Sequence, residues 1–223
     1  MRSLLAFRAL RPEPHLRPRR SVGYARTVTA RPLDPFAMLR DDAASCTSCG
    51  LAATRSTVVF GEGDPAADLL IVGEAPGAEE DRTGRPFVGR SGQLLDRLLA
   101  EEVGLDRGGC FIANVVKCRP PENRNPAKDE IAACRPWLEQ QVALMTPKVV
   151  LTLGNFSSRL LLGTTEGITR LRGRAYEVEL GGRIVALVPT FHLAAVLRGG
   201  KIPMAQVRDD LGLVAEHLGK VAA

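Results

Sequence analysis

The chain has 223 residues, and 45% of them are hydrophobic, which is enough to bury the core of one domain with an extension. No uninterrupted apolar run approaches the length that spans a bilayer, so we expect a soluble, cytoplasmic protein that does not bind membranes. The net charge of +5 is misleading, because residues 1–31 hold eight arginines against one acidic residue. The other 22 basic and 24 acidic residues sum to −2, so the globular part must hold any polyanion by locally placed charge.

Residues 1–35 form an extension rich in arginine and proline, and we expect it to be disordered. Its composition fits a basic arm for nucleic acid, an organellar transit peptide, or an unstructured extension without a binding role. The sequence leaves all three interpretations open. We expect the folded domain to cover residues 36–223.

Strand and helix patterns alternate from Val58 onward. The expected strands cover 68–73, 110–116, 148–154 and a hairpin of 175–180 with 183–188. The expected helices cover 91–105, 127–141, 155–162 and 202–218. Ser91 and Asn155 are the expected caps of two of them. This alternation predicts an α/β fold, a three-layer α/β/α sandwich around a short, mainly parallel sheet.

Ligands of such folds bind beyond the carboxyl ends of the strands. Three loops leave the expected strands at these ends, over residues 73–77, 114–125 and 190–198. They carry polar side chains that an active site could use, namely Glu74, Asn114, Lys117, Arg119, His192 and Arg198. We therefore expect a carboxylate, an amide and an imidazole to meet on one rim of the sheet.

Four cysteines occur in two groups, a C-x2-C pair at Cys46 and Cys49 and two distant residues, Cys118 and Cys134. Such a set can hold one tetrahedral metal centre, and spacing alone does not separate zinc from an iron–sulfur cubane. The alternatives are ordinary core thiols and disulfides, although no secretory signal is evident. Cys110 starts an apolar strand, and we expect it to be a core residue.

Five motifs, in this order, resemble those of the family 4 uracil-DNA glycosylases over residues 46–218. They are Gly-Glu-Ala-Pro-Gly at 73–77, Gly-Arg-Pro-Phe-Val-Gly at 84–89, Asn-Val-Val-Lys-Cys-Arg-Pro-Pro at 114–121, Asn-Arg-Asn-Pro at 123–126 and Thr-Phe-His at 190–192. The resemblance implies an α/β/α fold, a [4Fe–4S] cluster on the four cysteines, and a monomer that acts on uracil-containing DNA. One departure is Leu193, where the family usually has proline after the histidine.

The implied reaction is hydrolysis of the N-glycosidic bond of deoxyuridine after the base is flipped out of the duplex. Phe87 resembles the ring on which the base stacks, although it could be a core residue. Asn114 can pair with uracil N3–H and O4 together and reject cytosine, although it could be a strand-end turn residue. His192 can donate to uracil O2 as negative charge develops there, and Glu74 can stabilise the sugar cation and orient the water.

The remaining implied contacts concern the pocket wall and the phosphates. Backbone amides around Ala75, with Gly77 and Glu80, are expected to contact the base. Arg119, Arg124 and Arg198 are expected to contact DNA phosphates. The cluster is given a structural role, because glycosidic hydrolysis needs no electrons.

Three rival interpretations stand beside this one. A relative that bonds covalently to uracil has Gly-Glu-Gln-Pro-Gly and a histidine-containing insertion, whereas this chain has Ala75 and no histidine over 121–124. Family 5 glycosylases lack the acidic residue of the first motif, and Glu74 argues against them. The third is a non-catalytic iron–sulfur module that binds DNA.

Overall fold

The computed structural model describes residues 34–198 and 204–219, so almost all of the expected extension over 1–35 lies outside the described residues. The strands are β1 Glu62–Gly63, β2 Leu69–Gly73, β3 Phe111–Asn114, β4 Val149–Leu153, β5 Tyr176–Leu180 and β6 Arg183–Thr190. The α-helices are α1 Pro35–Ala44, α2 Ala78–Thr83, α3 Arg90–Leu98, α4 Lys128–Met145, α5 Asn155–Leu162, α6 Ile168–Leu171, α7 Leu193–Leu197 and α8 Met204–His217. Short helical turns cover Gly50–Ala53, Leu99–Val103, Arg107–Gly109 and Pro121–Asn123.

The strands form one sheet in the order β1-β3-β2-β4-β6-β5. The four central strands run parallel, and the two outer strands β1 and β5 pair antiparallel with their neighbours. All residues of β2 and β4 are buried, as expected for central strands covered on both faces. The mainly parallel sheet confirms the predicted fold class.

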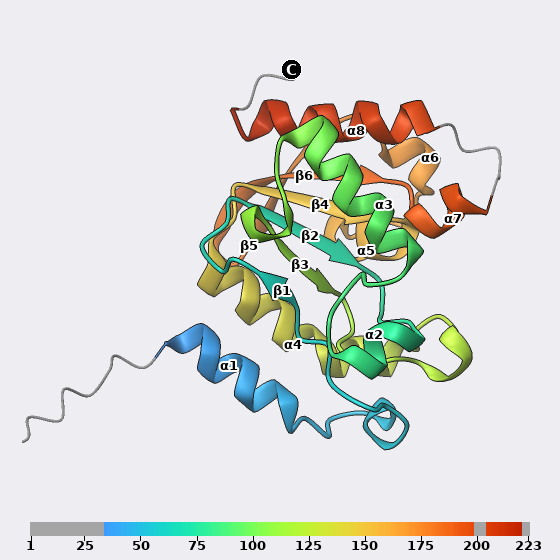
Figure 1. Cartoon of the computed structure of the whole chain (residues 1–223). Helices are drawn as coiled ribbons and strands as arrows, with labels where there is room; N and C mark the ends of the chain where they lie inside the picture. Colours follow the sequence, from blue (N-terminus) through green and yellow to red (C-terminus); the bar gives the residue numbers. More distant parts are fainter. Residues whose placement is uncertain (1–33, 199–203, 220–223) are drawn as a thin grey trace, which may run out of the picture. The chain divides into compact units, whose positions relative to one another are not determined.

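Helices cover both faces of this sheet (Figure 1). On one face, Leu95 and Leu98 of α3 and Leu211 of α8 share a buried cluster with the sheet. On the other face, Phe36 of α1 and Leu138 of α4 belong to a second cluster. The three expected layers are therefore present, and two separate cores hold the sheet between them.

The register of the parallel strands brings the three expected loops together. Gly73 at the end of β2 pairs with Asn114 at the end of β3, and Leu153 of β4 pairs with Thr190 of β6. The polar loops that follow these strands therefore leave the sheet along one edge, which is the rim expected for a site in this fold class.

Both expected helix caps are wrong. The helix α3 begins at Arg90 with Gly89 as its N-cap, so Ser91 lies inside the first turn. The helix α5 is capped by Gly154, and the Asn155 side chain instead accepts a hydrogen bond from the backbone N–H of Ile168 at 2.7 Å. In both cases a glycine occupies the cap, and at Gly154 an added Cβ would lie 2.9 Å from His192 Cβ, too close to admit a side chain.

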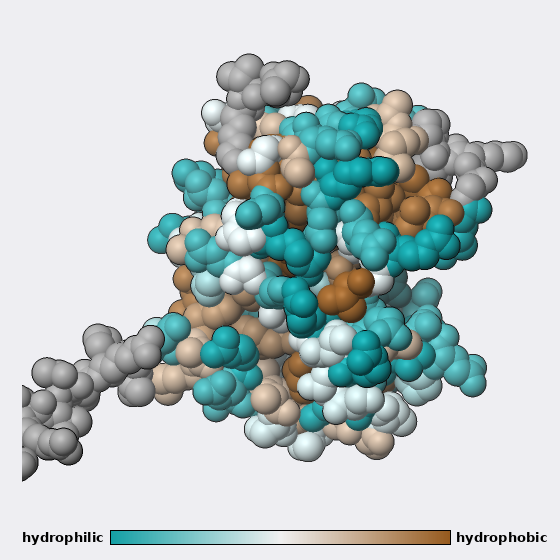
Figure 2. Space-filling model, in the orientation of Figure 1, coloured by the Kyte–Doolittle hydropathy of each residue, from teal (hydrophilic) through white to brown (hydrophobic). Residues whose placement is uncertain are grey.

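None of the described helices is long and apolar enough to cross a membrane. The face shown in Figure 2 is largely hydrophilic, with several separate apolar patches.

Candidate active site and four-cysteine cavity

A cleft of about 1030 Å³ opens at the carboxyl edge of the sheet. Its lining includes every residue expected to contact the base or perform the chemistry: Glu74, Ala75, Gly77, Glu80, Phe87, Asn114 and His192. Residues from four loops, far apart in the sequence, thus share one cavity. Of the three arginines expected to contact DNA, Arg124 and Arg198 line the cleft, and Arg119 lies outside its lining.

Asn114 ends β3, and its side chain is buried with only 1% of its surface exposed. Its Oδ1 has no hydrogen-bond partner in the described structure. A buried amide oxygen without a partner costs roughly 1–3 kcal/mol, so such a group is rare unless a ligand completes it. Asn114 is therefore placed to bind a polar group that enters the cleft.

Phe87 and Asn114 meet at the end of β2. A Cβ added to Gly73 would lie 2.3 Å from Asn114 Oδ1 and 2.6 Å from Phe87 Cζ. Only glycine lets the amide and the aromatic ring both approach the strand end this closely. The phenylalanine is 8% exposed and has φ of +51°, a left-handed conformation that is unfavourable for a bulky residue.

Glu80 fixes the two loops around the ring. Its carboxylate accepts hydrogen bonds from the backbone N–H of Gly77 at 3.1 Å, of Val88 at 3.1 Å and of Gly89 at 3.3 Å. The side chain lines the cleft, but its oxygens are occupied by backbone donors. This arrangement makes Glu80 a residue that shapes the pocket wall.

His192 is the N-cap of α7 and lines the cleft. Its Nδ1 accepts a hydrogen bond from the backbone N–H of Ala194 at 3.2 Å, which leaves the proton of the neutral ring on Nε2. Burial, and secondarily the positive charge of Arg198, lower the pKa of His192 below its ordinary value. The histidine is therefore a neutral hydrogen-bond donor at physiological pH.

The position after this histidine is held by packing. Leu193 is 1% exposed and belongs to the apolar core beneath α3 and α8. It is also the first residue of α7, a position where proline is readily accommodated. The buried leucine thus anchors the loop in place of the restricted backbone that proline would provide.

Glu74 follows β2 directly and lines the cleft between Asn114 and the loop of Ala75. Burial raises the pKa of its carboxyl group above the ordinary value. A half-buried carboxylate of this kind is a frequent feature of functional sites, because its charge is strongly felt by a bound group.

The three arginines near the cleft differ in their surroundings. Arg124 forms a two-point ion pair with Glu130, with its Nη2 at 2.6 Å from Oε1. Arg119 donates to the side chain of Asn123 at 2.8 Å. Arg198 ends α7 beside His192 and is exposed. Arg124 is expected to contact a DNA phosphate, and Glu130 already compensates its positive charge.

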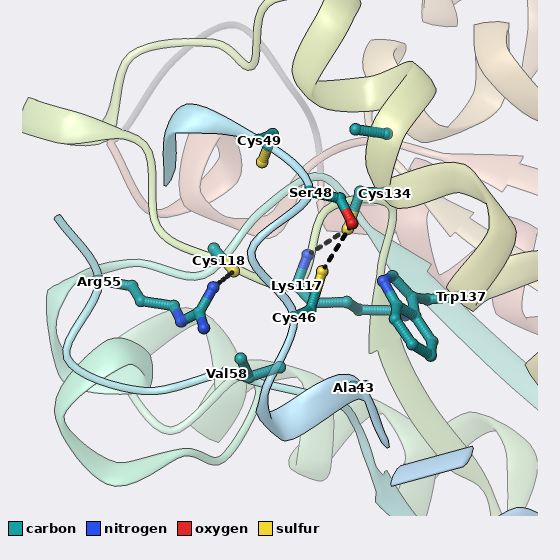
Figure 3. A pocket seen from close by; sticks show the side chains of 11 residues that line it. Ala43, Cys46, Ser48, Cys49, Arg55, Val58, Lys117, Cys118, Cys134 and Trp137 are labelled. Carbon is teal, nitrogen blue, oxygen red and sulfur yellow. Dashed lines mark hydrogen bonds between the residues drawn. The ribbon is translucent and has the colours of Figure 1, made fainter. Parts of the chain in front are cut away.

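All four cysteines of the expected metal site line one cavity, together with residues of α1 and α4 (Figure 3). Arg55 donates to Cys118 Sγ at 3.4 Å, and the backbone N–H of Lys117 donates to Cys134 Sγ at 3.2 Å. Hydrogen bonds to sulfur of this kind stabilise thiolate ligands. Among the residues that the structure describes, no group of three or more His, Cys, Asp or Glu side chains is arranged to hold a metal ion.

The structure bears on one of the alternatives for the cysteines. All five are free thiols, which removes the disulfide interpretation. Cys110 is buried in the core beneath α3, as expected, and it takes no part in the four-cysteine cavity.

Lys117 connects this cavity to the cleft. Its side chain is buried, and its Nζ donates to the backbone O of Asn114 at 2.9 Å and to Gln141 Oε1 at 2.5 Å. The same residue donates its backbone N–H to Cys134. The segment from Asn114 to Cys118 therefore links the amide of the cleft directly to two of the cysteines.

An α/β/α sandwich with a polar cleft at its carboxyl edge and a four-cysteine cavity beside it defines the class of this protein. The chain belongs to the uracil DNA glycosylase superfamily, whose family model matches residues 60–211. Among curated relatives, the Type-4 uracil-DNA glycosylase of Sulfurisphaera tokodaii is 42% identical over 169 residues, which cover 74% of this chain and 77% of the relative.

Two further relatives distinguish between the types. The Type-4 uracil-DNA glycosylase of Thermotoga maritima is 46% identical over 154 residues, which cover 69% of this chain and 78% of the relative. The Type-5 uracil-DNA glycosylase of Thermus thermophilus is 34% identical over 154 residues, or 61% of this chain and 68% of the relative. The chain thus resembles these type-4 enzymes more strongly, which confirms the resemblance seen in the motifs.

Three residues around the site make contacts that the sequence did not suggest. Gly154 has φ of +97°, and a Cβ added there would lie 2.9 Å from His192 Cβ. The sequence indicates Lys117 only as a rim residue, and it indicates nothing for Arg107, whose guanidinium donates to the backbone O of Phe87. Gly154 could have been found as the glycine that ends an expected strand, whereas Arg107 has no sequence signal.

Proposed function

We propose that this protein removes uracil from DNA by hydrolysing its N-glycosidic bond and leaving an abasic site. The observation that carries the proposal is the buried, unpartnered Oδ1 of Asn114 beside the Phe87 ring in one cleft. An amide can accept a hydrogen bond from uracil N3–H with its oxygen and donate to O4 with its nitrogen. Cytosine presents the reversed pattern at these two positions, so the same amide rejects it.

The flipped uracil would stack on Phe87 while Asn114 reads its edge. As the glycosidic bond breaks, negative charge develops on uracil O2, and the Nε2–H of His192 would donate to it. A neutral imidazole suits this function, because it donates a hydrogen bond without needing to change its protonation state. The lowered pKa of His192 supports this assignment.

The sugar acquires positive charge in the same step. The ionised carboxylate of Glu74 would stabilise this charge and orient the attacking water. Its partial burial strengthens the interaction, because fewer water molecules screen the charge. The backbone around Ala75 and Gly77 would complete the wall on this side, and Glu80 would hold it in place through the amide of Gly77.

We further propose that Cys46, Cys49, Cys118 and Cys134 hold a [4Fe–4S] cluster. Four thiols around one cavity, two of them receiving hydrogen bonds, support this ligand set. A cubane accepts thiolates that are more widely separated than the sulfurs around one zinc ion, which all lie about 2.3 Å from the same centre. When bound, the cluster would supply a rigid cross-link between the C-x2-C loop and the segment that carries Asn114.

Arg198 and Arg119 are the proposed phosphate contacts, since neither forms an ion pair with a carboxylate among the residues that the structure describes. Arg124 would contact a phosphate while it remains held by Glu130. We propose that the domain over 36–223 acts as a monomer and that the extension over 1–35 adds nonspecific attraction to DNA.

The test is incubation of the purified, iron-loaded full chain with an oligonucleotide that contains a single uracil. Alkali-labile abasic sites should appear at the uracil position and be absent from matched oligonucleotides that carry cytosine or thymine there. DNA binding without base release would instead support the non-catalytic iron–sulfur module.

A further inference from the structure

The loop that carries Phe87 is held by an arginine from a distant part of the chain. Arg107 begins the helical turn Arg107–Gly109, just before β3. Its Nη2 donates to the backbone O of Pro86 at 2.6 Å, and its Nη1 donates to the backbone O of Phe87 at 3.1 Å. One guanidinium therefore holds two successive carbonyl groups, including that of the aromatic residue itself.

Two carboxylates fix this guanidinium in place. Nη1 also donates to Asp96 Oδ1 at 2.9 Å, and Nη2 also donates to Glu62 Oε2 at 3.2 Å. The Arg107 side chain is only 20% exposed. Its planar fork is thus oriented before any ligand binds, which lysine could not reproduce.

The carbonyl of Phe87 is enclosed from a second side by Gly92. A Cβ added to Gly92 would lie 1.6 Å from the Phe87 backbone O. Phe87 has φ of +51°, and a bulky residue in this conformation persists only when its surroundings enforce it. The contacts of Arg107 supply such enforcement on the carbonyl side of the loop.

The amide side of the loop is held independently. The carboxylate of Glu80 accepts the N–H groups of Val88 and Gly89. The guanidinium of Arg107 thus binds two carbonyl groups of the loop, and the carboxylate of Glu80 binds the two amide groups that follow Phe87. This arrangement leaves the Phe87 ring as the part of the loop that faces Asn114 and the cleft.

We propose that Arg107 is a positioning residue for base recognition, which keeps the Phe87 ring against Asn114 before the base enters the cleft. This inference rests on the proposed function, because it takes Phe87 as the stacking ring. Without Arg107 the loop populates other conformations. The apparent affinity for the flipped base is then the intrinsic affinity multiplied by the fraction of molecules whose loop keeps the binding conformation. If that fraction is about one tenth, KM rises about tenfold while the rate at saturating DNA changes little.

The experiment compares Arg107→Met with Arg85→Met in the iron-loaded full chain. Arg85 also forms an ion pair with Glu62, at 2.6 Å, so both variants remove one cation from this carboxylate. Only Arg107 donates to the carbonyls of the Phe87 loop. We expect Arg107→Met to raise KM for uracil-containing DNA and the inhibition constant of free uracil about tenfold, and Arg85→Met to leave both unchanged.

Two further variants keep the inference falsifiable if Arg107→Met lowers stability. Arg107→Lys retains the charge but not the two-point contact, and its KM should also rise. In a Phe87→Ala background, Arg107→Lys should have no further effect on KM, because the residue acts through the ring. A full Arg107 effect in that background, or an unchanged KM in both Arg107 variants, would overturn the inference while leaving the proposed function intact. Failure of the wild-type protein to release uracil in the same assay would overturn both.

Discussion

Replacing Gly73 by alanine is expected to displace both residues that are proposed to recognise the base. The new Cβ would lie 2.3 Å from Asn114 Oδ1 and 2.6 Å from Phe87 Cζ, whereas real contacts of a Cβ are essentially never below 3.0 Å. Both side chains are largely buried, and hydrogen bonds to Arg107 and Glu80 hold the Phe87 loop, so neither side chain moves without changing the shape of the cleft. Each must shift by at least several tenths of an ångström, and the strand end must yield as well.

A misplacement of about 1 Å caused by a mutation can cost about 100-fold in rate. We therefore expect Gly73→Ala to lower the single-turnover rate of uracil release by about 100-fold. Overpacking of this kind also costs about 1–3 kcal/mol of stability, which a thermal melt would record. Gly212→Ala in α8 is the matched control, because nothing lies within 4 Å of its added Cβ.

The measurement is the single-turnover rate at saturating DNA, made well below the melting temperature of the variant. If Gly73→Ala cleaves at the rate of Gly212→Ala, the expected displacement of Asn114 and Phe87 does not occur or has no effect on catalysis. In that case the close packing of the amide and the ring against the strand end would not matter for function.

Three further predictions concern the acid–base groups and the metal site. His192→Ala should lose a hydrogen-bond donor to the leaving base and slow single-turnover cleavage on the order of 100-fold, with DNA affinity in a binding assay nearly unchanged. Burial raises the pKa of Glu74 above the ordinary value of 4.5, so the rate should be full above this raised pKa and fall as the pH is lowered through it. Glu74→Gln should lower the rate and abolish this acid limb in a pH profile. Cys118→Ala should lose iron and acid-labile sulfide, whereas Cys110→Ala should retain both, because Cys110 lies outside the cavity. Stoichiometric zinc without sulfide in the wild-type protein would contradict the proposed cluster.

Much of the fold could be predicted because buried strands and amphipathic helices have different periods. The central strands of the sheet are continuous apolar runs, and each appears where the sequence indicates it. The caps of α3 and α5 could not be predicted, because a polar residue at the start of a helix is the usual signal for a cap. In both helices the cap is instead a glycine that precedes the polar residue. At Gly154 the close approach of His192 matters more than the loss of a side-chain hydrogen bond, whereas nothing in the packing around Gly89 explains the glycine there.

Glu74, Asn114 and His192 could be predicted because each lies at or just after the end of a strand. Phe87 and Glu80 lie away from the strand ends, and only the resemblance of their motifs indicated them. The partners of these residues could not be predicted, because these partners are set by tertiary contacts. Arg107 binds carbonyls about 20 residues earlier in the chain, and the backbone of any sequence offers such carbonyls. The ion pair of Arg124 with Glu130 was likewise not anticipated, although these residues lie six positions apart.

Base discrimination is the sharpest test of whether the buried amide of Asn114 reads uracil. Single-turnover release should be measured for uracil and cytosine in the same oligonucleotide, with the wild type and with Asn114→Asp. The wild type should release uracil alone, and Asn114→Asp should lose most of this activity at saturating DNA, because an ionised carboxylate cannot donate to O4. Wild-type rates of uracil release from Asn114→Asp would contradict the account.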